Sequence, residues 1–288
     1  MTIQVFNTDQ LFLIKKGQIH RQTLKNEIDQ ALNNNQFGDN FIISSLPGLG
    51  KSYEMDLAIN RMTNPPLIFK GDNGFFGYFL DITTAIYLNG GPQNKLVVVN
   101  DDCDVLFEDK IINTTKKMFD DTRILRYGKN YRSLRPLCSD TQWLAVQSFA
   151  DDARAGLDID VKNVTFITLT NCHLHTVDEV EAQEDGSPKW SKYNSRYAIR
   201  RRTEYKEIEM PSLELWGYVA DVVLNEHICE KHFPGIKQAH KEQILLWCYQ
   251  KWDKGITERN LSIIEKMTKK IVQYPNNYLD IWEQEYVK

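Results

Sequence analysis

The stretch FIISSLPGLGKSYEMDLAI, residues 41–59, decides the fold that the sequence predicts. It begins with an apolar run, holds two glycines at its centre, and ends with apolar side chains at helical spacing. We therefore expect a buried strand, then a tight turn, then a helix. Gly48, Gly50, Lys51 and Ser52 fall where the turn meets the helix, so successive backbone N–H groups there can wrap a phosphate.

One residue departs from the usual phosphate-binding loop, because Ser45 stands where the first glycine is normally found. Serine is small and fits such a turn as long as its φ stays negative. In this interpretation the lysine neutralises phosphate oxygens and the hydroxyl of Ser52 holds Mg²⁺. The alternative is a Gly-Lys-Ser sequence that begins a helix by chance. The residues expected to contact the nucleotide are Pro47, Gly48, Leu49, Gly50, Lys51, Ser52 and Tyr53.

A second motif follows, in LVVVNDDCDVLF, where Asp101 and Asp102 end an apolar strand 50 residues beyond Lys51. In a parallel sheet the carboxyl ends of the strands face the crevice in which ligands bind. We expect Asp101 to hold Mg²⁺ and Asp102 to polarise an attacking water. A solvated acidic turn is the alternative. The two motifs in this order favour a site for a nucleotide and Mg²⁺.

The rest of the chain alternates between strand and helix patterns until about residue 211. The predicted strands cover residues 40–44, 66–71, 95–100, 163–171 and 202–211, and a helix over residues 20–36 follows a short extended start. This alternation predicts an α/β fold with a five-stranded parallel sheet flanked by helices.

The pattern changes at residue 212, beyond which only helical spacing is found. We therefore predict an α/β nucleotide-binding domain over residues 1–211 and a helical domain over residues 212–288. Two segments of the first domain look inserted, at about residues 127–162 and 175–194, and the second is polar enough to form an exposed loop.

Composition limits the class of protein. The 288 residues are 42% hydrophobic and 26% charged, with a net charge of −4 that argues against coating nucleic acid wholesale. Five cysteines without CxxC spacing suit a reducing environment. No apolar run approaches the roughly 20 residues of a membrane span. We expect a soluble, cytoplasmic protein, in the host cytoplasm if the chain is viral, with no membrane partner.

The two motifs resemble those of the AAA+ ATPases over residues 20–273. The family pattern GxPGxGK[ST] is met by SLPGLGKS except at Ser45, and DExDxL is met by DDCDVL except that Asp102 replaces a glutamate. Aspartate is one methylene shorter, so the attacking water must lie closer or hydrolysis is slower. The resemblance implies a P-loop NTPase with a helical lid that hydrolyses ATP in a homo-oligomeric ring, most often a hexamer. Parts of the chain also look like AAA+ proteins of tailed phages.

The resemblance also implies roles for residues outside the two motifs. FITLTN is similar to a sensor-1 strand, which makes Asn171 the residue that orients the attacking water. TERNLSIIEKM is similar to a sensor-2 helix, which gives Arg259 a contact with the γ-phosphate in the same subunit. A turn residue and an ordinary helix start are the respective alternatives.

The arginine that reaches a neighbouring subunit is assigned in the same way. AIRRRTEYKEIEMP resembles the segment that supplies this arginine finger, with Arg202 favoured over Arg201. NSRYAI offers Arg196 as a third candidate. Ordinary surface ion pairs, which contribute little to stability, are the alternative for each.

The substrate is left open by the sequence. Phe75 and Phe76 lie between two glycines where ring-forming AAA+ motors carry a pore loop, so they could grip a polypeptide or stack on single-stranded nucleic acid. They could equally anchor the next helix in the core. The basic and aromatic stretch RILRYGKNYRSLRP suits nucleic acid, a subunit interface or a solvated loop.

Two functions therefore remain. The first is a motor that remodels or translocates a macromolecule, and the alternative is an ATP-dependent assembly module or loader with little turnover, for example in phage DNA replication. Cys172, His173 and His175 are also possible metal ligands. They lack a matched second pair, so the sequence predicts no metal other than Mg²⁺.

Overall fold

The computed structural model describes residues 5–33, 38–70, 74–151, 153–182, 188–231 and 233–287. Contacts divide the chain into two compact units. The helical unit comprises Met1–Asn26, Leu46–Glu54 and Ile208–Lys288, and the sheet unit comprises Glu27–Ser45 and Met55–Glu207. The predicted domains, 1–211 and 212–288, stay a prediction.

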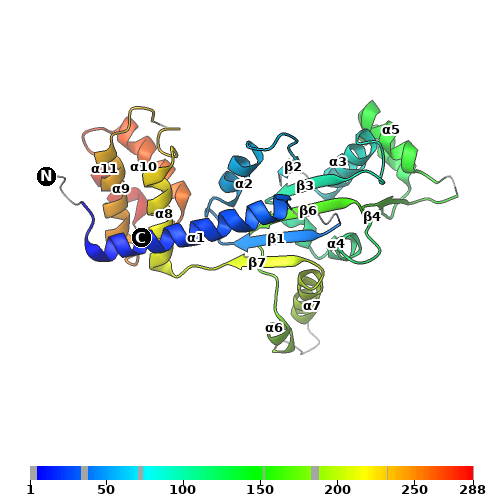
Figure 1. Ribbon diagram of the computed structural model, residues 1–288, viewed down its shortest axis with the longest axis horizontal. Coiled ribbons are helices and arrows are strands. Elements are labelled where there is room, and N and C mark those ends of the chain that lie inside the picture. The colour runs from blue at the N-terminus through cyan, green and yellow to red at the C-terminus, as the bar shows by residue number, and fades with distance from the viewer. Residues whose placement is uncertain are drawn as a thin grey trace. The chain divides into compact units, whose positions relative to one another are not determined.

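The sheet unit is built on five strands: β1 (Asn40–Ser45), β2 (Leu67–Lys70), β3 (Leu96–Asp101), β6 (Val164–Thr170) and β7 (Glu204–Ile208). Their order is β2-β3-β6-β1-β7, and the pairings β2–β3, β3–β6 and β6–β1 are all parallel (Figure 1). The predicted α/β fold with a five-stranded parallel sheet is confirmed. β1 and β6 are buried along their whole length, as the continuous apolar runs indicate.

Helices cover this sheet and close its core. They include α3 (Phe75–Leu88), the short η1 (Asp104–Phe107), α4 (Ile112–Phe119) and α7 (Pro188–Arg200). The core is formed by fully buried apolar side chains such as Ile42, Phe79, Val98 and Phe166. Such a core holds the strand ends in fixed positions, and the functional side chains of this unit follow those ends.

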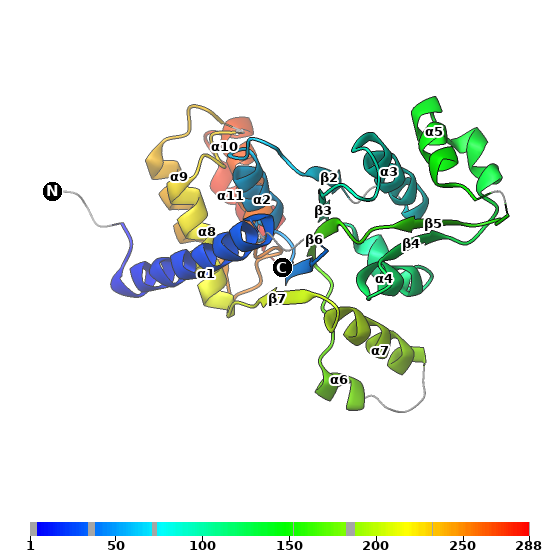
Figure 2. The same ribbon diagram turned by 45° about the vertical axis from the view of Figure 1, so that its right-hand side comes forward.

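The segment expected as an insertion at residues 127–162 contains a small sheet of its own. β4 (Ile124–Tyr127) pairs antiparallel with β5 (Leu157–Asp160), and between them lie η2 (Tyr131–Leu137) and α5 (Asp140–Phe149) (Figure 2). Arg126 and Asp158 face each other across the strands in a bidentate pair, at 2.6 and 2.7 Å. α5 packs against α3, which joins this segment to the main core.

The predicted polar loop at residues 175–194 is only partly a loop. Residues 177–181 form α6 (Val177–Glu181), and α7 begins at Pro188, so the prediction is wrong for both segments. The signal for α6 was a capping box, in which Thr176 and Glu179 satisfy each other's backbone N–H groups. Residues 183–187 lie outside the described part of the chain.

The helical unit contains α8 (Ser212–Asn225), α9 (Gln238–Lys251), α10 (Leu261–Gln273) and α11 (Tyr278–Tyr286). Its core holds Trp216, Trp252 and Trp282, all fully buried. The indole of Trp216 donates to the carbonyl of Leu245, and that of Trp252 donates to the carbonyl of Ser212, at 3.1 and 2.6 Å. Within the described part of the chain, no helix has the length and apolar character needed to cross a bilayer.

The first helix, α1 (Thr8–Asn33), begins well before the predicted start at residue 20. Asn7 and Gln10 cap it reciprocally, each side-chain oxygen accepting the other's backbone N–H at 2.9 Å. Gly17 lowers the local helix propensity. The position nevertheless requires glycine, because a Cβ there would lie 2.2 Å from the backbone of Gly217 on α8.

Candidate nucleotide-binding site

The glycine loop joins β1 to α2 (Lys51–Ile59), in the strand–turn–helix order that the sequence predicts. Gly48 and Gly50 have φ values of 78° and 74°, which side-chain-bearing residues rarely adopt. Lys51 is the first residue of α2 and is 95% buried, while Ser52 is half-buried. The loop therefore opens onto a helix N-terminus, where backbone N–H groups and the helix dipole favour an anion.

Residues of the helical unit hold the backbone carbonyls of this loop. The hydroxyl of Tyr218 donates to the carbonyl of Leu49 at 2.5 Å. The backbone N–H of Leu261 donates to the carbonyl of Gly48 at 3.1 Å. A Cβ added at Gly48 would lie 2.5 Å from the side chain of Asn260, so the loop and the start of α10 fit closely. Because these carbonyls are already bonded, the loop conformation is fixed by contacts within the unit.

A buried arginine ties the helix that follows the loop to its neighbours. Arg21 on α1 donates through Nε to Glu54 of α2 at 2.6 Å, and its other nitrogens contact Asp221 and Glu226 of α8 and the turn after it. Burial alone would lower the pKa of Arg21, but hydrogen bonds with Glu226 and Glu54 outweigh it and raise the pKa. Three carboxylates surround this one cation, so removal of any of these groups would leave buried charge without its compensating partner.

The acidic pair lies in the sheet unit, where the sequence places it. Asp101 ends β3 and is 94% buried, with its carboxylate 4.0 Å from Lys70 Nζ. Asp102 is exposed and has a φ of 55°, a region that Asp and Asn tolerate better than most residues. Asn171 Nδ2 donates to Asp102 Oδ1 at 3.3 Å, so these two predicted site residues are in contact.

Sheet topology explains why these residues meet. β3, β6 and β1 are adjacent and parallel, with Asp101 opposite Leu169 and Ser44 opposite Thr170. Their carboxyl ends therefore share one edge of the sheet. Asp102 and Asn171 follow two of these ends, and the chain leaves the third directly into the glycine loop.

The predicted arginine fingers lie in the sheet unit, near the end of α7. Arg200 donates to the carbonyl of Leu174 at 2.6 Å and stacks over Tyr205, which leaves it a structural role. Arg196 is half-buried, and its Nε has no hydrogen-bond partner. Arg201 and Arg202 are exposed.

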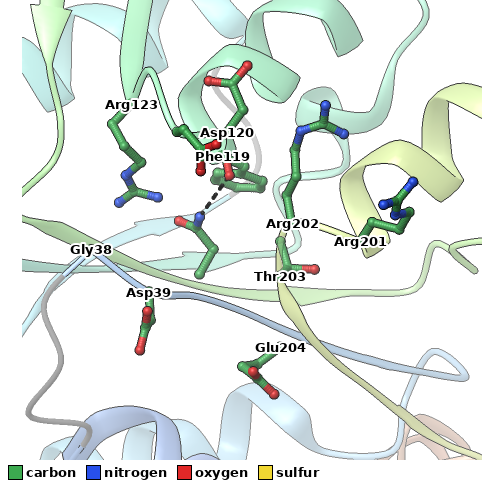
Figure 3. A pocket seen from close by; sticks show the side chains of 11 residues that line it. Gly38, Asp39, Phe119, Asp120, Arg123, Arg201, Arg202, Thr203 and Glu204 are labelled. Carbon is green, nitrogen blue, oxygen red and sulfur yellow. Dashed lines mark hydrogen bonds between the residues drawn. The ribbon is translucent and has the colours of Figure 1, made fainter.

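Arg201 and Arg202 line a pocket of about 730 Å³ (Figure 3). Its other walls include Gly38–Asn40, Phe119–Asp121, Arg123 and Thr203–Glu204. Because Gly38–Asn40 lead into β1 and Thr203–Glu204 lead into β7, the pocket lies at the amino ends of these strands. The two arginines are thus at the edge of the sheet opposite Asp102 and Asn171.

Arg259 belongs to the helical unit and lies two residues before the start of α10, with Nη1 donating to Ser212 Oγ at 3.2 Å. Its neighbour Asn260 caps α10, and the side chain of Asn260 fills the space where a Cβ on Gly48 would stand. Arg259 is exposed and shares this helix start with Leu261, the residue bonded to Gly48. Arg259, the predicted sensor-2 residue, therefore lies near the glycine loop, and both belong to the helical unit.

Phe75 and Phe76 form the first turn of α3. Both are half-buried and pack against the core of the sheet unit, Phe75 beside Tyr78 and Phe76 edge-on to Tyr127 with centroids 6.2 Å apart. The predicted loop before them, residues 71–73, lies outside the described part of the chain.

Several residues of the site have no sequence motif. Tyr218 and Arg21 act on the glycine loop and α2 from elements far away in the chain, so no spacing rule finds them. Asn260 could have been noticed, because an asparagine before an apolar periodic run is a typical N-cap.

No protein-family model and no curated protein matches the sequence. Among solved structures, the chain is similar to the S. cerevisiae Hsp104–ADP complex, with 14% identity and a TM-score of 0.39, over 99% of this chain and 51% of that chain. It is also similar to a closed state of Hsp104 with ATPγS and FITC casein, with 13% identity and a TM-score of 0.42, over 98% and 48%. The chain spans about half the length of these solved chains.

Proposed function

We propose that the protein is a Mg²⁺-dependent ATP hydrolase of the AAA+ type. The contact between Asn171 and Asp102 carries this proposal, because it pairs a carboxylate with an amide at the sheet edge from which the glycine loop departs. Asp102 accepts a proton from the attacking water, and Asn171 orients that water. Backbone N–H groups of the loop and Lys51 bind the phosphates.

The metal would be held by Ser52 and Asp101, which are oxygen ligands of the kind Mg²⁺ prefers. When bound, Mg²⁺ neutralises charge on the β- and γ-phosphate oxygens. The fit rests on the donor set, since Ser52 offers a hydroxyl oxygen and Asp101 a carboxylate that is 94% buried beside Lys70. Arg259 contacts the γ-phosphate in the same subunit.

The proposed assembly is a homo-oligomeric ring, with a hexamer as the expected form. Arg202 is proposed as the finger, with Arg201 and Arg196 as the further candidates. The position of Arg202 at the edge opposite Asp102 supports action on a neighbouring subunit, because the arginine cannot reach its own catalytic pair across the sheet. A finger of this kind stabilises transition-state charge.

The work done by hydrolysis is proposed to be the remodelling or translocation of a polypeptide or of single-stranded nucleic acid. Phe75 and Phe76 are the proposed contacts with that substrate. Their half-buried packing supports the competing role of core anchors equally well.

Steady-state hydrolysis with purified protein tests the proposal. Asp102→Asn is expected to lower kcat about 10²- to 10⁴-fold while ATP binding persists, because only the general base is lost. Lys51→Ala is expected to abolish ATP binding. Asp109→Asn is the matched control, since Asp109 is an exposed aspartate a few residues away. Turnover that survives Asp102→Asn would remove the assigned catalytic role.

One feature favours a second function, an ATP-dependent assembly module or loader with little turnover, for example in phage DNA replication. Asp102 stands where the AAA+ pattern has a glutamate, and its side chain is one methylene shorter, so it reaches less far toward an attacking water. This function predicts assembly that requires ATP, measured by sedimentation, together with negligible hydrolysis by the unaltered protein.

A further inference from the structure

Two histidines and a glutamate cluster beyond the end of β6, apart from the acidic pair. His173, His175 and Glu179 each offer one ligand atom, and these atoms all lie within 4.8 Å of one another. His173 Nε2 is 2.9 Å from Glu179 Oε1, and His175 Nδ1 is 3.8 Å from Glu179 Oε2. Ligand atoms around a tetrahedral zinc ion are about 3.4 Å apart, given bonds of about 2.1 Å. The observed distances bracket that value.

His175 is held with an unused ligand atom pointing at this cluster. The residue is 92% buried, and its Nδ1 has no hydrogen-bond partner. Its ring stacks on Tyr193 of α7, with centroids 3.6 Å apart and planes at 4°. Burial and this stack hold Nδ1 in place, 3.8 Å from Glu179 Oε2.

The other two ligands are also fixed. His173 Nδ1 lies 2.7 Å from Glu207 Oε1 on β7, so a carboxylate already orients the ring nitrogen that faces away from the cluster. Histidines that bind metals usually donate their second N–H in this way. Glu179 is held by its capping box, where Oε2 accepts the backbone N–H of Thr176 at 2.6 Å. Its Oε1 faces His173.

We propose that His173 Nε2, His175 Nδ1 and Glu179 bind a zinc ion. Two imidazoles and one carboxylate form a donor set suited to Zn²⁺, with a fourth position open to water. The ion would tie the segment after β6 to α6, two residues beyond Asn171. This site is separate from the Mg²⁺ site proposed above and does not depend on it.

Without a metal, the same residues can form an ion-pair cluster with a protonated His173. Burial lowers the pKa of His173, but hydrogen bonds with Glu207 and Glu179 outweigh burial and raise it. This state is the alternative that the experiment must distinguish, because it needs no metal.

The test is titration of the full-length, nucleotide-free protein with Co²⁺ as a spectroscopic substitute for Zn²⁺, followed by displacement with Zn²⁺. Excess Mg²⁺ is present to occupy the oxygen ligands of the acidic pair. We expect saturable uptake of one Co²⁺ per chain, a visible d–d band, and loss of that band when Zn²⁺ is added.

Three variants assign the site. His175→Gln and Glu179→Gln should each weaken binding at least about tenfold, and Gln at position 179 preserves the capping box. Glu207→Gln removes only the orienting carboxylate and should weaken binding about 10- to 100-fold. Circular dichroism checks that each variant is folded.

His227→Gln is the control, because His227 is exposed and also lies near a glutamate, 3.6 Å from Glu230. It should leave Co²⁺ binding unchanged. Absence of saturable uptake, or uptake that His175→Gln and Glu179→Gln do not weaken, would overturn the proposal and leave the ion-pair cluster. None of these measurements involves ATP hydrolysis, so an absence of Co²⁺ binding would leave the proposed function unaffected.

Discussion

Gly48 is the residue of the glycine loop that tolerates the least change. Its φ of 78° is one that a side chain disfavours, and the space where a Cβ would stand is filled by Asn260. The two constraints are independent, since one is a property of the backbone and the other of packing. Relief of the clash by a smaller residue at 260 would still leave the strained backbone.

We therefore expect Gly48→Ala to weaken ATP binding strongly and to lower the free energy of unfolding by about 1–2 kcal/mol from backbone strain alone. The clash with Asn260 adds to this cost. Fluorescent-nucleotide titration and urea unfolding measure the two effects. Gly128→Ala is the control, because Gly128 is exposed and nothing lies within 4 Å of its added Cβ. Equal effects of both variants would contradict the assigned role.

For single residues, the sequence predicts the positions of those that follow the end of a strand or begin a helix. Asp102 and Asn171 follow apolar runs that could only be buried strands, so their meeting at one edge follows from parallel topology. Tyr218 could not be found in this way. It reaches Leu49 from 169 residues away, and only tertiary packing brings the two together.

Among the elements, α1, α2 and α8 are joined by the charges around Arg21. Glu226 follows α8, and its side chain is 23% exposed. Burial alone would raise the pKa of Glu226, but the hydrogen bond and charge of Arg21 outweigh it and lower the pKa. A carboxylate with a lowered pKa stabilises the folded state above its ordinary value of 4.5, and that stabilisation is lost as pH falls through the folded value.

Glu226→Gln should therefore lower the free energy of unfolding by about 1–2 kcal/mol at pH 7, with a difference that shrinks toward zero as pH falls below 4.5. Urea unfolding of both proteins across this range measures it. Glu209→Gln, at an exposed position of the same unit, should show no comparable dependence. A difference that stays constant as pH falls would show that the charge of Glu226 is not what stabilises the cluster.

The first turn of α3 gives a prediction about packing. Phe76 is half-buried against Tyr127, so Phe76→Ala should lower the free energy of unfolding by about 2 kcal/mol. Leu88→Ala, on the same helix at a side chain that is 68% exposed, should change it by less than about 0.5 kcal/mol. Unchanged stability in Phe76→Ala, with loss of substrate-stimulated hydrolysis, would favour a grip on substrate over an anchor.

Element boundaries were predicted less well than element types. The five strands of the main sheet were found because each is a continuous or alternating apolar run, whereas the four-residue strands β4 and β5 were missed. The start of α1 was placed too late, since Gly17 and a polar surface weaken its helical signal although packing against Gly217 requires that glycine. α7 was expected as a loop over its first residues, because its polar composition hides a helix that tertiary contacts stabilise.

At the scale of the whole molecule, two sets of predicted site residues lie at opposite ends of the strands of the sheet. Asp102 and Asn171 follow the carboxyl ends of the strands, whereas Arg201 and Arg202 lie where β1 and β7 begin. The linear sequence does not reveal this separation, because Arg202 follows Asn171 by only 31 residues. A subunit with this arrangement needs another copy if an arginine is to complete its site, which is the geometry of a head-to-tail ring.

Mixed subunits test this dependence. Arg202→Ala alone should lower kcat about a thousandfold, and Lys51→Ala alone should be inactive. In an equal mixture, half of the sites keep Lys51 and half of the neighbours keep Arg202, so about one quarter of wild-type activity should return if interfaces are head-to-tail and mixing is random. Arg154→Ala is the matched control, because Arg154 is an exposed arginine with no proposed role, and it should retain activity by itself. A mixture no more active than its parts would mean that Arg202 does not act across a subunit interface.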